Sequence, residues 1–212
     1  MTDYRAFIAL VNREDLLRRA VESSYDVLPE LVVIDNSPHG ITFDPGCKVF
    51  RAPMPIQFSH SMNYAMLETR RQGAHICLWM HCDAWAPEGA YLKLIEAIHG
   101  YEAEGRKWGV VFTNYDALVA INTALIDDVG LWDNNIPWYF SDNDFYRRVR
   151  LGGYETIDTG IEVHHDYSQT LKSDPEVSFL NSILFPMYQQ FYRAKWGWVD
   201  GKETFDRPFN RP

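Results

Sequence analysis

Short apolar runs alternate with stretches whose apolar residues recur every three or four positions along the first half of the chain. The runs predict buried strands, because a strand covered on both faces is apolar throughout. The recurring pattern predicts helices with one buried face, and Leu16, Leu17, Ala20 and Val21 show it in the first of them. Expected strands occupy residues 5–11, 31–35, 47–53, 74–83 and 108–115, and expected helices occupy residues 14–24, 58–73 and 87–105.

Strands that alternate with helices in this way predict an α/β fold, namely a three-layer sandwich with a mostly parallel central sheet. The second half of the chain is less regular. We expect a helix that begins near Asp142 and ends at Gly152 and Gly153, followed by one strand over residues 154–165. The length of 212 residues predicts one domain over residues 1–175 and a helical or irregular extension, residues 176–212, packed on it.

Three acids lie at the ends of expected strands: Asp35, Asp83 and, less closely, Asp116. Ligands of open α/β sheets bind beyond the carboxyl ends of the strands, so these acids mark a candidate site for a nucleotide or another small ligand. The sequence has neither a GxGxxG motif after the first strand nor a GxxxxGK[ST] motif. A dinucleotide-dependent dehydrogenase and a P-loop nucleotidase are therefore excluded as leading interpretations.

Charge and cysteine content narrow the class of protein further. Lys plus Arg number 20 and Asp plus Glu number 29, which gives a net charge of −9, so no strong general affinity for nucleic acid is expected. Three cysteines without a CxxC pair predict a reducing, cytoplasmic setting and no structural zinc site. The opening apolar run, residues 7–11, is too short for a signal peptide or a membrane span, so we expect neither.

Six short motifs follow one another along the chain: "VNRED" after the first strand, "VVIDNSP", "FSHSMNYAM", "HCD", "SDNDFYRRVRLGGY" and "HHDYS". In these motifs and their order the chain resembles the family 2 glycosyltransferases of the GT-A fold, from about Phe7 to Ser168. The tail, "KWGWVDGKETFDRPF", is similar to that of small phage and bacterial enzymes of this kind, although Trp198 stands where a second glycine is expected.

The resemblance implies roles for individual residues. It places Asn12, Arg13, Asp35, Asn63 and His81 at the nucleotide. It also implies that Asp142 is the catalytic base, with Asp144 and Arg148 as orienting partners. Two departures from the family pattern stand out: His81 replaces the first acid of the DxD-like motif, and Ser141 replaces the acid before Asp142.

The chemistry of sugar transfer explains why the family needs these residue types. The departing pyrophosphate gains negative charge, and a hard cation held by carboxylates and phosphate oxygens stabilises it. Asp83 is the expected metal ligand, and one of His164 and His165 is expected to assist it, because adjacent strand residues face opposite ways. We favour His165. The imidazoles favour Mn²⁺ over Mg²⁺. The resemblance thus implies an inverting, metal-dependent glycosyltransferase with a nucleotide-diphosphate sugar as donor.

Each of these residues also has a purely structural interpretation. Asp35 before Asn-Ser-Pro is typical of an Asx turn. His81 is also compatible with a histidine at a strand end whose ring nitrogens bond protein groups. Asp142 and Asp144 are also compatible with a purely structural role as negative charges at the start of a helix. A catalytically silent nucleotide- or glycan-binding domain is therefore the alternative function. The donor sugar stays open, and so does the acceptor, which is a glycan, a lipid-linked sugar or a modified nucleobase.

Overall fold

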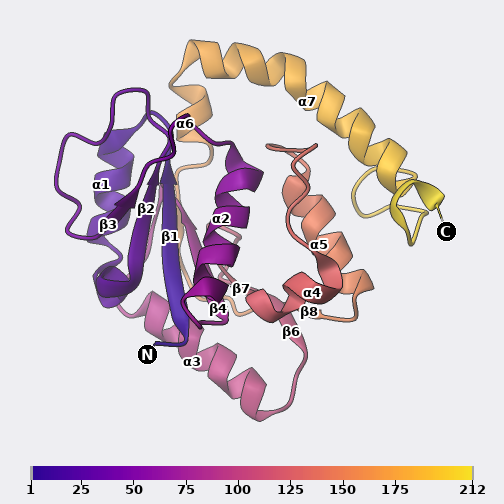
Figure 1. The fold of residues 1–212 in the computed structure, drawn as a ribbon, viewed down its shortest axis with the longest axis horizontal. Helices are drawn as coiled ribbons and strands as arrows, with labels where there is room; N and C mark the ends of the chain where they lie inside the picture. The colour runs from indigo at the N-terminus through magenta and orange to yellow at the C-terminus, as the bar shows by residue number, and fades with distance from the viewer. Residues whose placement is uncertain (1, 212) are drawn as a thin grey trace.

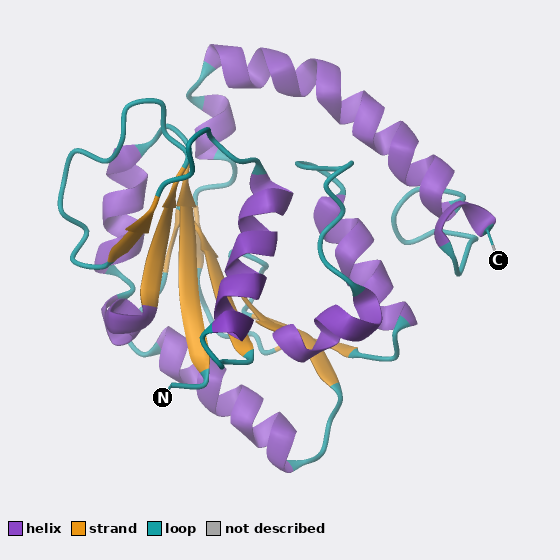
Figure 2. Ribbon diagram, in the orientation of Figure 1, coloured by secondary structure: helices purple, strands orange, loops and turns teal. Residues whose placement is uncertain are grey.

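The computed structural model describes residues 2–211, and its centre is a seven-stranded sheet with the order β3-β2-β1-β4-β7-β6-β8 (Figures 1 and 2). Every strand of this sheet is parallel to the others except β7, which runs antiparallel to β4 and β6. The strands are Tyr4–Leu10 (β1), Leu31–Asp35 (β2), Lys48–Phe50 (β3), Ile76–His81 (β4), Trp108–Phe112 (β6), Leu118–Asn122 (β7) and Glu155–Asp158 (β8). A second sheet pairs Ala84–Trp85 (β5) with His164–His165 (β9).

Helices cover both faces of the large sheet (Figure 2). The helices are Glu14–Glu22 (α1), Phe58–Arg71 (α2), Ala90–Ala103 (α3), Ile126–Val129 (α4), Ser141–Leu151 (α5), Gln169–Lys172 (α6) and Pro175–Trp196 (α7), and 3-10 turns span Tyr25–Glu30 (η1), Thr123–Leu125 (η2) and Pro208–Asn210 (η3). Within residues 2–211, no helix combines the length and the apolar character that crossing a membrane requires.

Strand β4 shows how the sequence builds the layers. Its side chains alternate between two cores: Ile76, Leu78 and Met80 pack with α1 and α3, whereas Cys77 and Trp79 pack with α2 and α5. A strand buried on both faces needs apolar residues at every position, and this explains the unbroken apolar run in the sequence. The expected three-layer sandwich with a mostly parallel sheet is therefore confirmed.

Two parts of the second half differ from the expected elements. Strand β7 is an additional strand that follows β6 after a turn and returns antiparallel to insert between β4 and β6. The single strand expected over residues 154–165 is two short strands in different sheets. The chain leaves the large sheet after Asp158, where the backbone N–H of Gly160 bonds the Asp158 carboxylate and Gly160 adopts a φ of 65°, a conformation that glycine adopts without strain.

The C-terminal end of α7 is attached to α5 by a buried polar cluster. Asp144 of α5 is 0% exposed, and its carboxylate accepts hydrogen bonds from Trp196 Nε1 at 2.8 Å and Arg148 Nε at 2.9 Å. Lys195 Nζ lies 2.6 Å from Asp144 Oδ1 and 2.7 Å from Asp133 Oδ2. These contacts hold the C-terminal end of α7 against α5, the helix that carries Asp142.

Removing the Asp144 carboxylate should destabilise the fold strongly. Asp144→Ala leaves Lys195 and Arg148 without a buried counter-charge, and breaking a buried ion pair in this way costs about 3–5 kcal/mol. The matched control is Asp127→Ala, which removes an exposed carboxylate paired with Arg70 and should cost less than about 1 kcal/mol. Urea unfolding of both variants measures the difference. Equal free energies of unfolding would contradict the proposed importance of this cluster.

Candidate active site

The carboxyl ends of β2, β1 and β4 lie side by side at one edge of the sheet. Leu10 of β1 pairs with Asp35 of β2, and Ala9 of β1 pairs with His81 of β4. Asp35 and His81 therefore lie on strands two places apart, which corresponds to about 10 Å across the sheet. This edge is where open α/β sheets bind their ligands.

The small sheet brings a distant part of the chain to the end of β4. β5 pairs antiparallel with β9, so that Ala84 lies opposite His165 and Trp85 lies opposite His164. The Nε2 atom of His165 lies 3.0 Å from Asp83 Oδ1. His164 faces the other way and stacks on Trp85, with ring centroids 4.9 Å apart. Of the two histidines, only His165 faces Asp83.

His81, Asp83 and His165 form a cluster whose ligand atoms all lie within 4.8 Å of one another. Burial raises the pKa of Asp83, but the hydrogen bond and charge of His165 outweigh it and lower this pKa to about 2, so the carboxylate is ionised. Burial lowers the pKa of His81 below its usual value, which favours a neutral imidazole. One carboxylate and two imidazoles are a donor set that divalent transition metals accept.

His165 provides a further sign that this cluster fits a cation. Because Asp83 is ionised, Nε2 of His165 is the hydrogen-bond donor between them. The other ring nitrogen, Nδ1, is buried and has no hydrogen-bond partner among residues 2–211. The second oxygen of Asp83 accepts the backbone N–H of Gln169 at 3.0 Å, at the start of α6. The residues present therefore suit a Mn²⁺ or Mg²⁺ ion.

Two tyrosines surround His165 on the open side. Tyr115 stacks on the imidazole with ring centroids 5.5 Å apart, and Tyr167 lies 5.1 Å from it. Both rings are largely exposed, Tyr115 at 50% and Tyr167 at 63%. Tyr167 and Ser168 have positive φ angles of 54° and 65°, which is strained backbone for residues other than glycine. The site therefore has an exposed aromatic surface beside the cluster.

Asp142 lies in the first turn of α5, and Asp116 lies in the loop between β6 and β7. Burial raises the pKa of Asp142 to about 6, and the negative charge of Asp116 in that loop contributes. The charge of Asp116 also acts on His81. Asp116 thus lies close enough to both His81 and Asp142 for its charge to act on each of them. A carboxylate with a pKa near 6 is largely ionised at neutral pH and is a stronger base than an ordinary aspartate.

Asp35 is fixed by its own turn at the end of β2. Its Oδ1 accepts the backbone N–H of Ser37 at 2.9 Å, which is the Asx turn considered from the sequence, and also the Ser37 hydroxyl. Its Oδ2 is paired with Arg51. Burial raises the pKa of Asp35, but the bonds from Ser37 and Arg51 more than offset this and leave it below its usual value.

Other residues expected at the site have protein partners instead. Asn63 donates to the Trp132 carbonyl and accepts the Trp132 N–H, so its amide joins α2 to the loop before α5. Asn12 donates to Asp174 at 2.8 Å, and Arg13 bonds Asp15 of its own turn. These bonds hold the three side chains without a ligand, and their expected place at the nucleotide stays a prediction.

Asp144 and Arg148 also face away from the cluster. Residues two apart on a helix are rotated by about 200° relative to each other, so Asp142 and Asp144 cannot face the same side. Arg148 donates to the carbonyls of Val129 and Leu131 as well as to Asp144. Their positions correct the expected orienting role, because the Asp144 carboxylate is inaccessible and its partners are structural.

Asp116 was predicted as a candidate site residue, because it follows an expected strand, although the loop around it became clear only in the structure. Several other residues of the site were not predicted. Tyr115, Tyr167, Gln169 and Arg51 carry no local signal, because their positions depend on contacts with residues far away in the sequence.

Comparison with known proteins places the fold. No family model matches the sequence, and no curated protein matches it. Among solved structures, TarS 1–349 of S. aureus aligns with a TM-score of 0.58 and 12% identity, over 86% of this chain and 65% of TarS 1–349. The present chain thus spans less than two thirds of that protein.

A second similar structure is glucosyl-3-phosphoglycerate synthase from Mycobacterium tuberculosis. Its complex with Mn²⁺ and UDP-glucose aligns with a TM-score of 0.53 and 13% identity, over 86% of this chain and 78% of the synthase. Its complex with Mg²⁺ and UDP gives a TM-score of 0.57. At these identities the likeness concerns the fold alone, and the chain has a GT-A fold.

Proposed function

We propose that this chain is an inverting, metal-dependent glycosyltransferase that moves a sugar from a nucleotide-diphosphate sugar to an acceptor hydroxyl. One observation carries the proposal. The cluster of His81, Asp83 and His165, which could hold an ion, lies at the carboxyl edge of the sheet, and the charge of Asp116 acts on both His81 and Asp142. We assign the cluster to the leaving group and Asp142 to the base, because an inverting displacement needs a base on the face of the sugar opposite the leaving group.

His81, Asp83 and His165 would hold the cation, which when bound neutralises the negative charge that develops on the departing pyrophosphate. Asp83 is ionised and buried, and Gln169 and His165 fix its orientation by hydrogen bonds. These contacts hold the carboxylate in place before any ligand arrives, so that little reorganisation is needed at the reaction.

The nucleoside would extend from the cluster toward Asp35. That carboxylate lies about 10 Å from His81 across the sheet, and Arg51 and Ser37 hold it in one position. A carboxylate offers about four lone-pair sites, so Asp35 can still accept a bond from a ribose hydroxyl or a base N–H. Asn12 and Arg13 flank the same edge through the turn after β1.

Asp142 would accept the proton of the acceptor hydroxyl as that oxygen attacks the sugar. The acceptor then lies near Tyr115 and Tyr167, whose exposed rings offer a surface on which a sugar or base ring can stack. A glycan, a lipid-linked sugar and a modified nucleobase all present such a ring.

A catalytically silent nucleotide- or glycan-binding domain is the competing interpretation, and turnover of a nucleotide sugar distinguishes the two. Incubation with UDP-, GDP- and TDP-sugars, with and without Mn²⁺, should release free nucleotide with one of them.

Metal binding should depend on His165 and not on its neighbour. Removing a residue that only hydrogen-bonds to a metal ligand lowers metal affinity by about 10–100-fold. His165 and Asp83 are expected to bind the ion directly, so His165→Ala or Asp83→Ala should lower Mn²⁺ affinity by at least about tenfold. The control, His164→Ala, removes the ring that stacks on Trp85 and should leave Mn²⁺ affinity unchanged. Electron paramagnetic resonance of free Mn²⁺ measures binding directly. Full turnover in excess chelator would exclude the metal from the reaction.

The base can be tested by one substitution and its pH dependence. Asp142→Asn keeps the shape and the helix start but removes the basicity, so transfer should slow by about 10²–10⁴-fold while donor affinity is preserved. In the unmodified protein, turnover should fall as the pH drops below about 6, because Asp142 becomes protonated there. The variant should lack this acidic limb. A variant with near-normal turnover would show that Asp142 is only structural.

The proposed nucleotide end of the site predicts a separate effect. Asp35→Ala should weaken nucleotide binding by about 1.5–3 kcal/mol, the scale of a hydrogen bond to a charged group. Asp44→Ala is the control, because Asp44 is an exposed acid whose carboxylate accepts the backbone N–H of Gly46 in its own turn. Calorimetry with the preferred nucleotide measures both. Unchanged affinity in a folded Asp35→Ala protein would remove Asp35 from the site.

A further inference from the structure

Helix α7 has apolar side chains on two opposite faces. On the inner face, Phe185 packs on Tyr139 and Phe140 with ring centroids 5.2 Å apart in both contacts, and Tyr192 and Trp196 are buried. This face explains how the helix is attached to the rest of the fold. It does not explain the apolar residues that point the other way.

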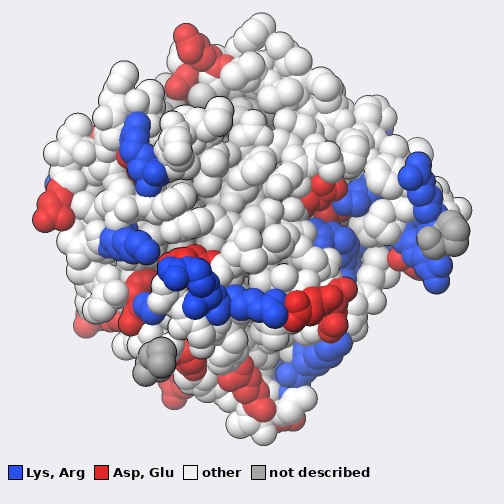
Figure 3. All heavy atoms as spheres, viewed as in Figure 1, with Lys and Arg blue, Asp and Glu red and all other residues white. Residues whose placement is uncertain are grey.

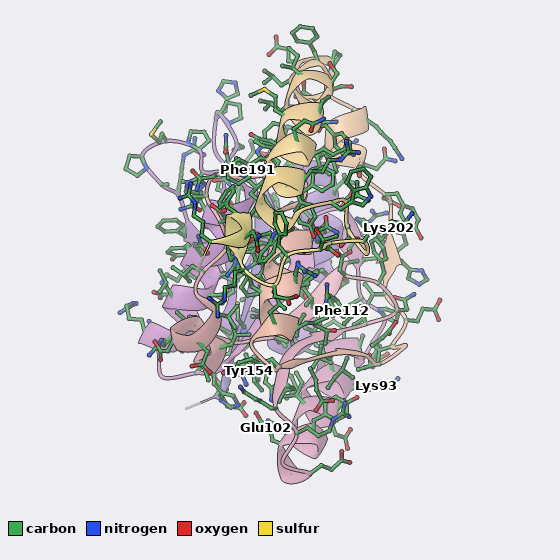
Figure 4. The ribbon with its side chains drawn as sticks, turned by 90° about the vertical axis from the view of Figure 1, so that its right-hand side faces the viewer. Lys93, Glu102, Phe112, Tyr154, Phe191 and Lys202 are labelled. Atoms are coloured by element: carbon green, nitrogen blue, oxygen red, sulfur yellow. The ribbon has the colours of Figure 1, made fainter. Side chains whose placement is uncertain are left out.

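The outer face carries a stripe of exposed apolar residues, namely Phe179, Leu180, Ile183 and Met187, which are 66%, 47%, 48% and 59% exposed. Their spacing places them within an arc of about 100° on an ideal helix, opposite Phe185. Among the described residues, none from Pro175 to Phe191 is buried. In Figure 4, where Phe191 is labelled near the end of α7, this helix projects upward from the rest of the fold.

The stripe is almost free of charge, unlike most of the molecule. Within α7 the only charged residues are Glu176 at the start and Arg193 and Lys195 at the end. Figure 3 shows mostly uncharged atoms along the path of α7. The chain has a net charge of −9, so two copies repel each other over most of their surface. Because the stripe is apolar and nearly uncharged, two copies repel each other least when they meet at it.

The shape and charge of the stripe favour another helix over a membrane as its partner. A helix that lies on a membrane has Lys and Arg along its polar face, whereas α7 has neither between Pro175 and Tyr192. Leu180, Ile183 and Met187 follow the three- and four-residue spacing of a coiled-coil seam. The 22 residues of α7 make a helix about 33 Å long.

We propose that α7 is a dimerisation helix, which pairs antiparallel with α7 of a second copy of this chain through Phe179, Leu180, Ile183 and Met187. With Ile183 of one copy facing Met187 of the other, Glu176 lies beside the end of the opposite helix that carries Arg193. This antiparallel register therefore pairs unlike charges at both ends, whereas a parallel register places Glu176 against Glu176. The inference is independent of the proposed function.

The pairing also reaches the candidate site. Asp174, which caps the start of α7, bonds Asn12 after β1, and Gln169 of the preceding α6 bonds Asp83. A dimer that fixes α7 would therefore also fix the segment that orients Asp83.

The oligomeric state of the full chain tests the proposal. Sedimentation equilibrium over a wide concentration range should show a reversible dimer. Ile183→Glu and Met187→Glu each put a charge into the seam and should raise its dissociation constant by about a hundredfold or more. The matched control is Leu92→Glu, a similarly exposed leucine at 51% on α3, which should leave the dimer intact. Circular dichroism checks that each variant is folded.

The register has its own test. Glu176→Lys should weaken the dimer, because it places a positive charge beside Arg193 of the other copy. Adding Arg193→Glu should restore the dimer, because the charges that meet are then again opposite. A protein that stays monomeric at every concentration would overturn the proposal, and so would a dimer that Ile183→Glu leaves unchanged. Binding of the monomer to anionic phospholipid vesicles, lost in Ile183→Glu, would instead identify the stripe as a membrane-binding surface.

Discussion

The hydrogen bond between Asp83 and His165 is the contact on which the candidate site depends. It joins residues 82 positions apart in the chain and accompanies the pairing of β5 with β9. The backbone supports it, because the N–H of Asp166 bonds the Asp83 carbonyl at 2.9 Å and the N–H of Gln169 bonds its carboxylate. A charged acceptor with several donors is held more firmly than one with a single neutral partner. Without these bonds the end of β4 would carry one buried acid and no site.

Helix α5 serves two purposes through two faces. Asp142 faces the loop that contains Asp116, and Asp144 faces α7, where it neutralises Lys195. A fully buried carboxylate is stable only with such partners. The polar core beneath α5 thus fixes the position of Asp142 relative to the sheet. The second acid of the "SDND" motif is therefore buried among structural partners, whereas the first is the residue that we propose as the base.

Strained backbone lies next to two elements of the candidate site, α5 and β9. Phe140, just before α5, has a φ of 68°, and Tyr167 and Ser168 beside His165 also have positive φ angles. Backbone of this kind persists only where surrounding contacts hold it, and it is frequent at functional sites. Phe140 packs against Phe185 of α7, so the helix outside the sheet helps to hold the strained residue that precedes Asp142.

The sequence alone determined the layered fold and the position of Asp83, because strand burial and strand ends are local properties of the apolar pattern. It also determined that only one of His164 and His165 can face Asp83, since neighbouring strand residues point to opposite sides. Only the tertiary structure decided which one, because that depends on the register of β9 against β5. The inserted strand β7, the inward direction of Asp144 and the protein partners of Asn63 were likewise decided by pairing between distant segments, which no local pattern encodes.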